Sequence, residues 1–209
     1  MGQHDIAFTM SGRRSNLVTG LYGSTRVLTV LGWQEVAALR AGDLILTREL
    51  GLMPVVDALI EPRQALWSVC FPAGSIGNEK TERLPPGQPV LIQTAVATPF
   101  SGDDMALVPA TSLEGWRGIA PQVPALTEII VQLRLEREAI IFAGPGLMVG
   151  CRGTDRGAFD LKRLFEWPSR PTIPLSAARH LAAHLVAAEA GAQLGNLQAA
   201  DLRPPPNLS

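Results

Sequence analysis

Aromatic side chains are scarce in this sequence, and neither sign of charge is in excess. The 209 residues include one Tyr and six Phe, and 19 acidic residues are balanced by 18 basic ones. Surfaces that bind nucleic acids need clustered basic residues and aromatic rings on which bases can stack. The composition therefore predicts that nucleic acid is not a partner.

Long apolar runs are also lacking. The N-terminal residues MGQHDIAFTMSGRR contain no apolar signal-peptide segment, and the most apolar stretch, residues 139–151, is interrupted by Gly-Pro-Gly. A membrane-spanning helix needs about 20 consecutive apolar residues. We therefore expect neither secretion nor membrane insertion, and we predict a cytoplasmic protein.

Only two cysteines are present, and they form no CxxC motif. Cys70 and Cys151 lie far apart in the sequence, which excludes zinc-ribbon and thioredoxin-like sites. Whether they form a disulfide is left open by the sequence. Two reduced thiols are the simpler interpretation for a cytoplasmic protein.

Candidate metal ligands are few. His180 and His184 have the i, i+4 spacing that lets two imidazoles on one helix meet a metal ion. Leu181 stands where the zincin motif has Glu, and no third ligand is close in the sequence. Asp103 and Asp104 lack the ligand spacing of a calcium loop and are interpreted as an exposed loop tip. The sequence therefore predicts no metal and no cofactor.

Short runs of β-forming residues, separated by turn residues, dominate residues 20–150. Residues 75–87 are polar and rich in turn formers, which is typical of a surface loop. Many short strands at this spacing indicate a compact, mainly β domain. The candidate strands are residues 26–30, 43–47, 55–60, 65–71, 89–93, 106–109, 128–136 and 139–143.

The clearest strand pattern lies in residues 128–136. Ile129, Val131, Leu133 and Leu135 alternate with mostly polar residues, and Ile130 is the apolar exception on the polar face. A period of two is the mark of a half-buried strand. Because residues 139–143 follow after a short turn, we predict that the two segments form a hairpin.

The two flanks of this region differ from it. Residues 1–19 are polar and predict a flexible arm, and residues 151–209 form a C-terminal extension. Within the extension, residues 159–167 predict a short helix and residues 175–194 a longer one, because Ala and Leu dominate the latter. Ser176 is the expected N-cap, and Gly195 is the expected end. The Pro-rich tail, residues 203–209, is predicted to be disordered.

Helix 175–194 also has an apolar stripe made by Leu181, Leu185 and Ala188. A stripe of this kind packs against another apolar surface. We expect it to contact either the β-domain or a partner protein.

Three segments, in this order, resemble the Hint (hedgehog/intein) family, most closely its stand-alone bacterial members. In the first segment, Val36, Leu39, Gly42 and Asp43 match a Val-x-x-Leu-x-x-Gly-Asp pattern between two strands. The second, residues 84–92 (LPPGQPVLI), resembles the central block of the family, and the third is residues 107–113 (LVPATSL). The resemblance implies a flattened, pseudo-twofold β-structure, in agreement with the strand pattern. The expected fold is a compact Hint-type β-fold with a C-terminal α-helical extension.

The same resemblance places Gly20 at the position of the family nucleophile and Gln88 at that of the block histidine. Hint autoprocessing begins when a Cys, Ser or Thr side chain attacks the carbonyl group just before it. Glycine has no attacking atom, and glutamine can donate a hydrogen bond but cannot titrate. Cys151 follows Val149-Gly150, so the Asn with which an intein ends is also missing. The family positions are therefore degenerate.

Three functions are compatible with these residues. The first is a catalytically inactive Hint module that acts by binding or as a structural element. In that case the C-terminal helix and the Pro-rich tail would contact an unidentified protein partner. The second is an autoprocessing Hint peptidase that uses Ser24 or Thr25, although a turn explains these two hydroxyls better. The third is a small-molecule-binding β-domain unrelated to the family. Oligomeric state is left open.

Overall fold

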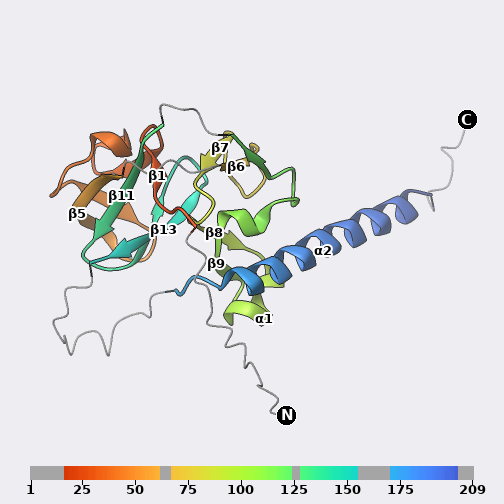
Figure 1. The fold of residues 1–209 in the computed structure, drawn as a ribbon. Helices are drawn as coiled ribbons and strands as arrows, with labels where there is room; N and C mark the ends of the chain where they lie inside the picture. The colour runs from red at the N-terminus through yellow and green to blue at the C-terminus, as the bar shows by residue number, and fades with distance from the viewer. Residues whose placement is uncertain (1–16, 62–66, 124–127, 155–169, 202–209) are drawn as a thin grey trace, which may run out of the picture.

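The computed structural model describes residues 17–61, 67–123, 128–154 and 170–201, with only the backbone given for Glu61 and residues 193–201. The predicted arm before residue 17, the helix at residues 159–167 and the tail at residues 203–209 lie outside this part. The described chain is mainly β-strand with one long helix at its C-terminal end (Figure 1). The expected fold class is confirmed.

Thirteen strands and five helical segments are present in the described chain. The strands are β1 (Leu21–Tyr22), β2 (Arg26–Thr29), β3 (Gly32–Glu35), β4 (Leu44–Thr47), β5 (Gly51–Glu61), β6 (Ser68–Phe71), β7 (Glu82–Leu84), β8 (Pro89–Gln93), β9 (Met105–Pro109), β10 (Ala120–Gln122), β11 (Ile130–Leu135), β12 (Ala139–Phe142) and β13 (Met148–Gly153). The helices are η1 (Val36–Ala38), η2 (Ala95–Ala97), α1 (Thr98–Ser101), η3 (Ala110–Leu113) and α2 (Leu175–Asp201).

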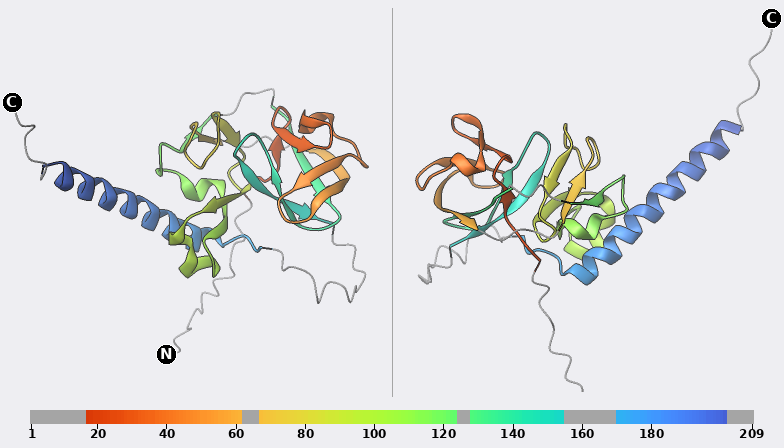
Figure 2. Two further views of the ribbon diagram at one scale, coloured as in Figure 1. Left: turned by 180° about the vertical axis from the view of Figure 1, so that it is seen from behind. Right: turned by 45° about the horizontal axis from the view of Figure 1, so that its top comes forward.

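The strands form one large and one small sheet. The large sheet has the order β1-β11-β5-β4-β12-β13-β8-β9, and the β2–β3 hairpin branches from β4. The small sheet has the order β10-β6-β7. Long strand β5 pairs with β4 at its start and with β11 at its end, so it connects two parts of the large sheet. Strands β2 to β5 and helix α2 lie on opposite sides of the molecule (Figure 2).

Strand β11 shows both the strength and the limit of the alternation pattern. Val131, Leu133 and Leu135 are buried, as the pattern predicts, but Ile129 is 41% exposed. Ile130, the expected exception, is buried in a separate cluster with Tyr22 and Val18. Strand β1 pairs with this end of β11 and brings Tyr22 opposite Ile130. Both faces of the strand are therefore covered at Ile130, which one-strand periodicity cannot anticipate.

The predicted hairpin between residues 128–136 and 139–143 is wrong. Strand β11 pairs with β1, β5 and the end of β13, whereas β12 pairs with β13 and β4. The hairpin that does form joins β12 to β13 through the turn at residues 143–147, where Ala143 and Leu147 are hydrogen bonded. Strand β11 pairs with β5 where the prediction has β12 as its neighbour, and β5 is a strand of eleven residues.

The interpretation of residues 75–87 as a surface loop is also wrong in part. Asn78 is buried, and its side-chain nitrogen donates to the carbonyl groups of Phe71, Pro72 and Lys80. Its side-chain oxygen accepts from the backbone of Ile76. Asn78 thus replaces the backbone pairing that this polar segment lacks, and the chain then enters β7.

The C-terminal extension attaches to the β-domain before its helix begins. Arg170 donates to Asp103 at 2.6 and 2.5 Å and to the carbonyl oxygen of Met105 at 2.6 Å. The backbone amide of Ile173 then donates to Leu107, and Thr172 forms a parallel bridge with the same residue. The extension therefore adds a short strand-like segment, the C-terminal strap (residues 170–173), to the edge of β9.

Helix α2 packs through its first turns and then projects from the domain (Figures 1 and 2). Leu181 and Leu185 are buried against η2, η3 and β9, but Ala188 is exposed, so the expected stripe is shorter than predicted. Within the described chain, no helix is long and apolar enough to cross a membrane.

The start of α2 at Leu175 is predicted as observed, but the expected N-cap and the expected C-terminal end are wrong. The carbonyl of Pro174 accepts the first helical hydrogen bond from Ala178, so Ser176 lies inside the first turn and is not the N-cap. The helix also continues through Gly195 to Asp201. One glycine costs a helix about 1 kcal/mol, and the good helix formers on both sides outweigh that cost.

Candidate functional site

The structure brings Gly20 and Gln88, the two positions that the family resemblance singles out, together at a single peptide bond, which joins Thr19 to Gly20. The residues just before this peptide bond lie against Gly87, whose backbone amide donates to the carbonyl oxygen of Val18 at 2.8 Å. A side chain at Gly87 would collide with Leu17 and Val18. Glycine at this position therefore lets the incoming chain lie directly on the start of the block segment. We call the Thr19–Gly20 peptide and its contacts the junction site.

Gln88 holds the junction site from one side. Its Oε1 accepts from the backbone amide of Gly20 at 2.9 Å, and its Nε2 donates to the carbonyl oxygen of Gly150 at 2.8 Å. The side chain is only 4% exposed. Because one backbone partner is a donor and the other an acceptor, the orientation of the amide is fixed. Gln88 therefore connects the entry of the domain to strand β13 near its exit.

Gln132 holds the same peptide from the other side. Its Nε2 donates to the carbonyl oxygen of Thr19 at 2.5 Å and lies 3.3 Å from the Thr19 hydroxyl. A donor aimed at a peptide carbonyl is what an oxyanion hole requires. The junction peptide therefore keeps a donor on its carbonyl oxygen but presents its amide to an acceptor.

Position 20 has no room for a side chain. Gly20 has a φ of +110°, and a Cβ there would lie 2.7 Å from Cγ2 of Ile130 and 2.9 Å from the carbonyl oxygen of Val131. L-residues rarely adopt this φ, and the second contact is with backbone that cannot rotate away. Residue 20 thus has no side chain, and the space that a side chain would occupy is closed.

Cys151 is the thiol nearest in sequence to the exit contact at Gly150. Its Sγ donates to the carbonyl oxygen of Leu133 at 3.4 Å, and the residue is 8% exposed. Burial raises the pKa of the Cys151 thiol to about 12. A thiol attacks carbonyl groups as its thiolate, so Cys151 is unreactive at neutral pH. Cys70 lies on β6, and both cysteines are free.

Ser24 and Thr25 occupy a tight turn after β1. The backbone amide of Thr25 donates to Tyr22 at 2.8 Å, and its carbonyl oxygen accepts from Val36. Ser24 is exposed, and Thr25 is buried with 7% exposure. The backbone of Thr25 therefore has the turn role that the sequence indicates. Gly42 and Asp43 form a second such turn, with Gly42 at φ +96° and the Asp43 carboxylate accepting from the Arg40 amide.

Tyr22 lies two residues after the junction peptide. Burial, and then the Glu128 carboxylate, raise the pKa of its phenol. The Arg83 guanidinium lies over the ring, 5.7 Å from its centre, and pairs with Glu128. Tyr22 packs against Ile130 and Val18, so it supports the strand that lines position 20.

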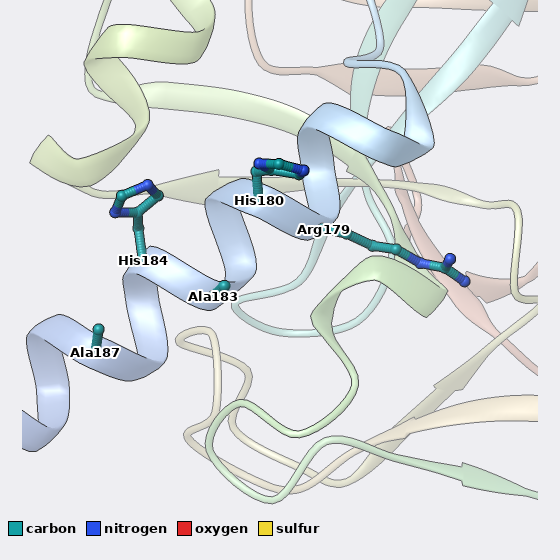
Figure 3. A pocket seen from close by; sticks show the side chains of 5 residues that line it. All are labelled: Arg179, His180, Ala183, His184 and Ala187. Atoms are coloured by element: carbon teal, nitrogen blue, oxygen red, sulfur yellow. The ribbon is translucent and has the colours of Figure 1, made fainter.

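The two candidate metal ligands on α2 lie far from this site. His180 and His184 are exposed beside a shallow depression that Ala183 and Ala187 also line, and Figure 3 shows Arg179 extending away from both imidazoles. The His184 ring contacts Phe100, with 5.9 Å between ring centres. In the part of the chain that the structure describes, no three His, Cys, Asp or Glu side chains converge as metal ligands.

The expected loop tip at Asp103 has a structural role. Hydrogen bonds from the Arg170 guanidinium hold the pKa of the Asp103 carboxyl at about 2. This carboxylate anchors the C-terminal strap, a role that the interpretation of Asp103 as an exposed loop tip did not include, although its side chain is 44% exposed. Asp104 remains exposed and accepts from Gln93.

The model of the Hint domain family matches residues 19–147, which is more than half of the chain. The chain therefore belongs to the Hint family, and the alternative of an unrelated β-domain is excluded. No curated protein matches the chain significantly.

Several solved structures are similar to the chain. A bacterial intein-like domain from Clostridium thermocellum is 12% identical, with a TM-score of 0.45, and the match covers 63% of this chain and 96% of that one. The MchDnaB-1 intein is 10% identical with a TM-score of 0.40, covering 62% and 98%. The AceL NrdHF class 3 split intein is 12% identical with a TM-score of 0.42, covering 64% and 97%.

Gln132 is a residue of the junction site that the sequence does not predict. Alternation assigns Gln132 to the polar face of its strand, together with Glu128 and Arg134. A polar residue facing solvent and one facing a buried peptide have the same sequence pattern. Gln132 faces a buried peptide because β1 and the residues just before it lie beside β11. These residues are more than 100 positions away in the sequence.

Proposed function

We propose that this chain is a catalytically inactive Hint domain that holds its N-terminal junction without breaking it and acts as a structural or binding module. The observation that carries the proposal is the closed position at Gly20, between the Ile130 side chain and the Val131 carbonyl group. Acyl transfer needs an attacking atom about 3–3.5 Å from the carbonyl carbon. Residue 20 supplies no such atom.

The orientation of Gln88 supports the same proposal. A peptide nitrogen must gain a proton to leave, so a catalytic group beside it has to be a donor. Gln88 presents its acceptor oxygen to the Gly20 amide, and its donor nitrogen is committed to Gly150. This arrangement favours the intact peptide. Gln132 alone polarises the Thr19 carbonyl group, and polarisation without a nucleophile leaves the bond whole.

The same contacts suggest what the module does. The Gln88 side chain connects Gly20 to Gly150 on β13. The domain therefore holds the chain that enters it against the strand that leads out of it. The projecting part of α2, and the tail beyond it, supply a contact element for an unidentified protein partner. Two free thiols are in keeping with a reducing compartment such as the cytoplasm.

Intact mass measurement tests the proposal. The full chain is incubated with and without a thiol or hydroxylamine, both of which trap acyl intermediates, and we expect the full-length mass throughout. Fragments beginning at residues 20–25 would establish self-cleavage and overturn the proposal. The variants Ser24→Ala and Thr25→Val would then identify the hydroxyl responsible.

A second variant tests whether cleavage is prevented only by the missing reactive side chains or also by the lack of space at residue 20. Gly20→Cys combined with Gln88→His restores the family residue types. We expect this protein to remain uncleaved because the φ at residue 20 and the Val131 carbonyl prevent the sulfur from approaching Thr19. Efficient cleavage would show that only the side chains had been lost and that the backbone remains competent.

A further inference from the structure

An apolar surface on strands β2 to β5 has no role in the junction site. In β4 and β5, Ile45 and Met53 face the core, while the intervening residues point outward. An antiparallel sheet with one solvated face normally carries polar residues on that face. Here the outward residues Leu44, Leu46, Leu52 and Pro54 are all apolar.

The β2–β3 hairpin extends the same surface. The backbone amide of Val30 donates to the carbonyl oxygen of Leu44, so the hairpin turn lies beside the start of β4. Trp33 pairs with Leu28 across the hairpin. We call the exposed large side chains on these strands the apolar face: Val30 (56% exposed), Leu31 (80%), Trp33 (36%), Leu44 (37%) and Leu52 (46%).

From this surface we infer an interface between two copies of the chain. The apolar face exposes about 500 Å² of apolar area, which is at the upper end for a monomer and is typical of functional patches. A standard interface buries about 800 Å² on each partner, including its polar rim. The partly exposed neighbours Leu28, Leu46 and Pro54, with the charged pair Arg26 and Glu35 at the end of the hairpin, supply the remaining area.

A second copy fits this face better than an unlike partner for two reasons. An isologous contact uses the same patch on both subunits, so one apolar face is sufficient. Two antiparallel sheets also pack naturally face to face, about 10 Å apart. Helix α2 cannot cover the face because it lies on the opposite side of the molecule (Figures 1 and 2).

The edge of the face adds a second means of association. Among the described strands, β3 pairs with β2 alone, so its outer edge is open. Its sequence, Gly-Trp-Gln-Glu, contains neither Pro nor Lys, the residues that most often protect open edges. In a face-to-face dimer with its twofold axis near Trp33, two such edges would lie close to each other.

Sedimentation velocity of the full chain, between about 1 and 100 µM, tests this inference. We expect a dimer that dissociates on dilution. The double variant Leu31→Asp, Leu52→Glu is expected to be monomeric throughout and to unfold at the thermal midpoint of the wild type diluted to its monomer, because both side chains are exposed in the monomer. The control Leu59→Glu, Ile60→Glu changes two exposed residues at the far end of β5 and is expected to remain dimeric.

Four outcomes would overturn the inference. A wild-type chain that is monomeric throughout has no such interface. A double variant that remains dimeric associates through another surface. A monomeric wild-type chain that binds phosphatidylglycerol vesicles, while the double variant does not, uses the face for a membrane. A monomeric double variant whose thermal midpoint lies below that of the wild type diluted to its monomer would mean that another segment of the same chain covers the face.

Discussion

The backbone amide of Gly20 donates to the side-chain oxygen of Gln88, although 68 residues separate them in the sequence. The resemblance to the Hint family predicts that these are the positions of its nucleophile and its block histidine. The structure brings the two positions into contact, and neither carries a reactive group. A glutamine oxygen accepting from the peptide nitrogen stabilises the ground state of that peptide, which supports the proposal that the junction peptide stays intact.

Replacing Gln88 tests its structural contribution. Gln88→Ala leaves the Gly20 amide and the Gly150 carbonyl without their partner, and each unsatisfied buried group costs about 1–3 kcal/mol. We expect the free energy of unfolding, measured in urea, to fall by about 2–4 kcal/mol. The control Gln93→Ala removes an exposed amide and should change it by less than about 0.5 kcal/mol. Equal losses of unfolding free energy in the two variants would mean that water satisfies the Gly20 amide and the Gly150 carbonyl group in place of Gln88.

Adding one methyl group at Gly20 tests the closed position. Gly20→Ala combines an unfavourable φ with a collision, whereas Gly51→Ala has a φ of +70° and no heavy atom within 4 Å of the new Cβ. We expect a loss of about 1 kcal/mol for Gly51→Ala from the backbone alone. Gly20→Ala should lose about 2 kcal/mol more because of the overpacking. Thermal unfolding of the two variants side by side measures the difference, and equal losses would show that position 20 is open.

The buried Cys151 thiol makes stability depend on pH above neutrality. Its pKa in the folded state is about 12, whereas an unfolded cysteine titrates near 8.5. Between these values the folded state binds more protons than the unfolded state, so stability falls as pH rises. From pH 8 to pH 10 we expect Cys151 to account for a loss of about 2 kcal/mol. Cys151→Ala should lack this loss when urea unfolding is compared at the two pH values. A parallel decline in both proteins would assign the effect to other groups.

The ion pair between Asp103 and Arg170 controls the attachment of the C-terminal strap. The pKa of Asp103 lies below its unfolded value, so its contribution is present above about pH 4 and is lost as pH falls toward 2. In Asp103→Asn at neutral pH, we expect faster hydrogen exchange of the Ile173 amide, which donates to Leu107. Asp104→Asn is the matched control and should exchange like the wild type. Unchanged protection in Asp103→Asn would show that the strand-like hydrogen bonds suffice.

Local signals in the sequence account for most of the strands. The boundaries of β8 are predicted as observed, and those of β4 and β9 differ by one residue, because turn residues delimit short apolar runs there. Gly20 and Gln88 are identified through a family resemblance, which carries three-dimensional information that composition does not contain. Pairing of β11 with β5 and β1 is not predicted, because a strand's partner depends on residues far away in the chain.

The remaining differences have the same origin. Asn78 lies in a polar segment of the sequence, whereas Gln132 lies between Val131 and Leu133 in an alternating strand. Long-range chain contacts convert Gln132 into an internal hydrogen-bonding group. Asp103 is part of an ordinary loop until Arg170, 67 residues later, binds it. The apolar face was not anticipated either, since outward leucines in β4 and β5 look like core residues in a single strand.

The double role of Gln88 has a mechanical consequence. Because its oxygen is bonded to the entering chain and its nitrogen to β13, tension that pulls the N-terminal and C-terminal flanks apart acts on both ends of one amide. Load would therefore reach these two hydrogen bonds together with the Gln132 and Gly87 contacts, before it spreads into the strands behind them. Under such a load, the resistance of the domain to stretching would be concentrated at a few atoms.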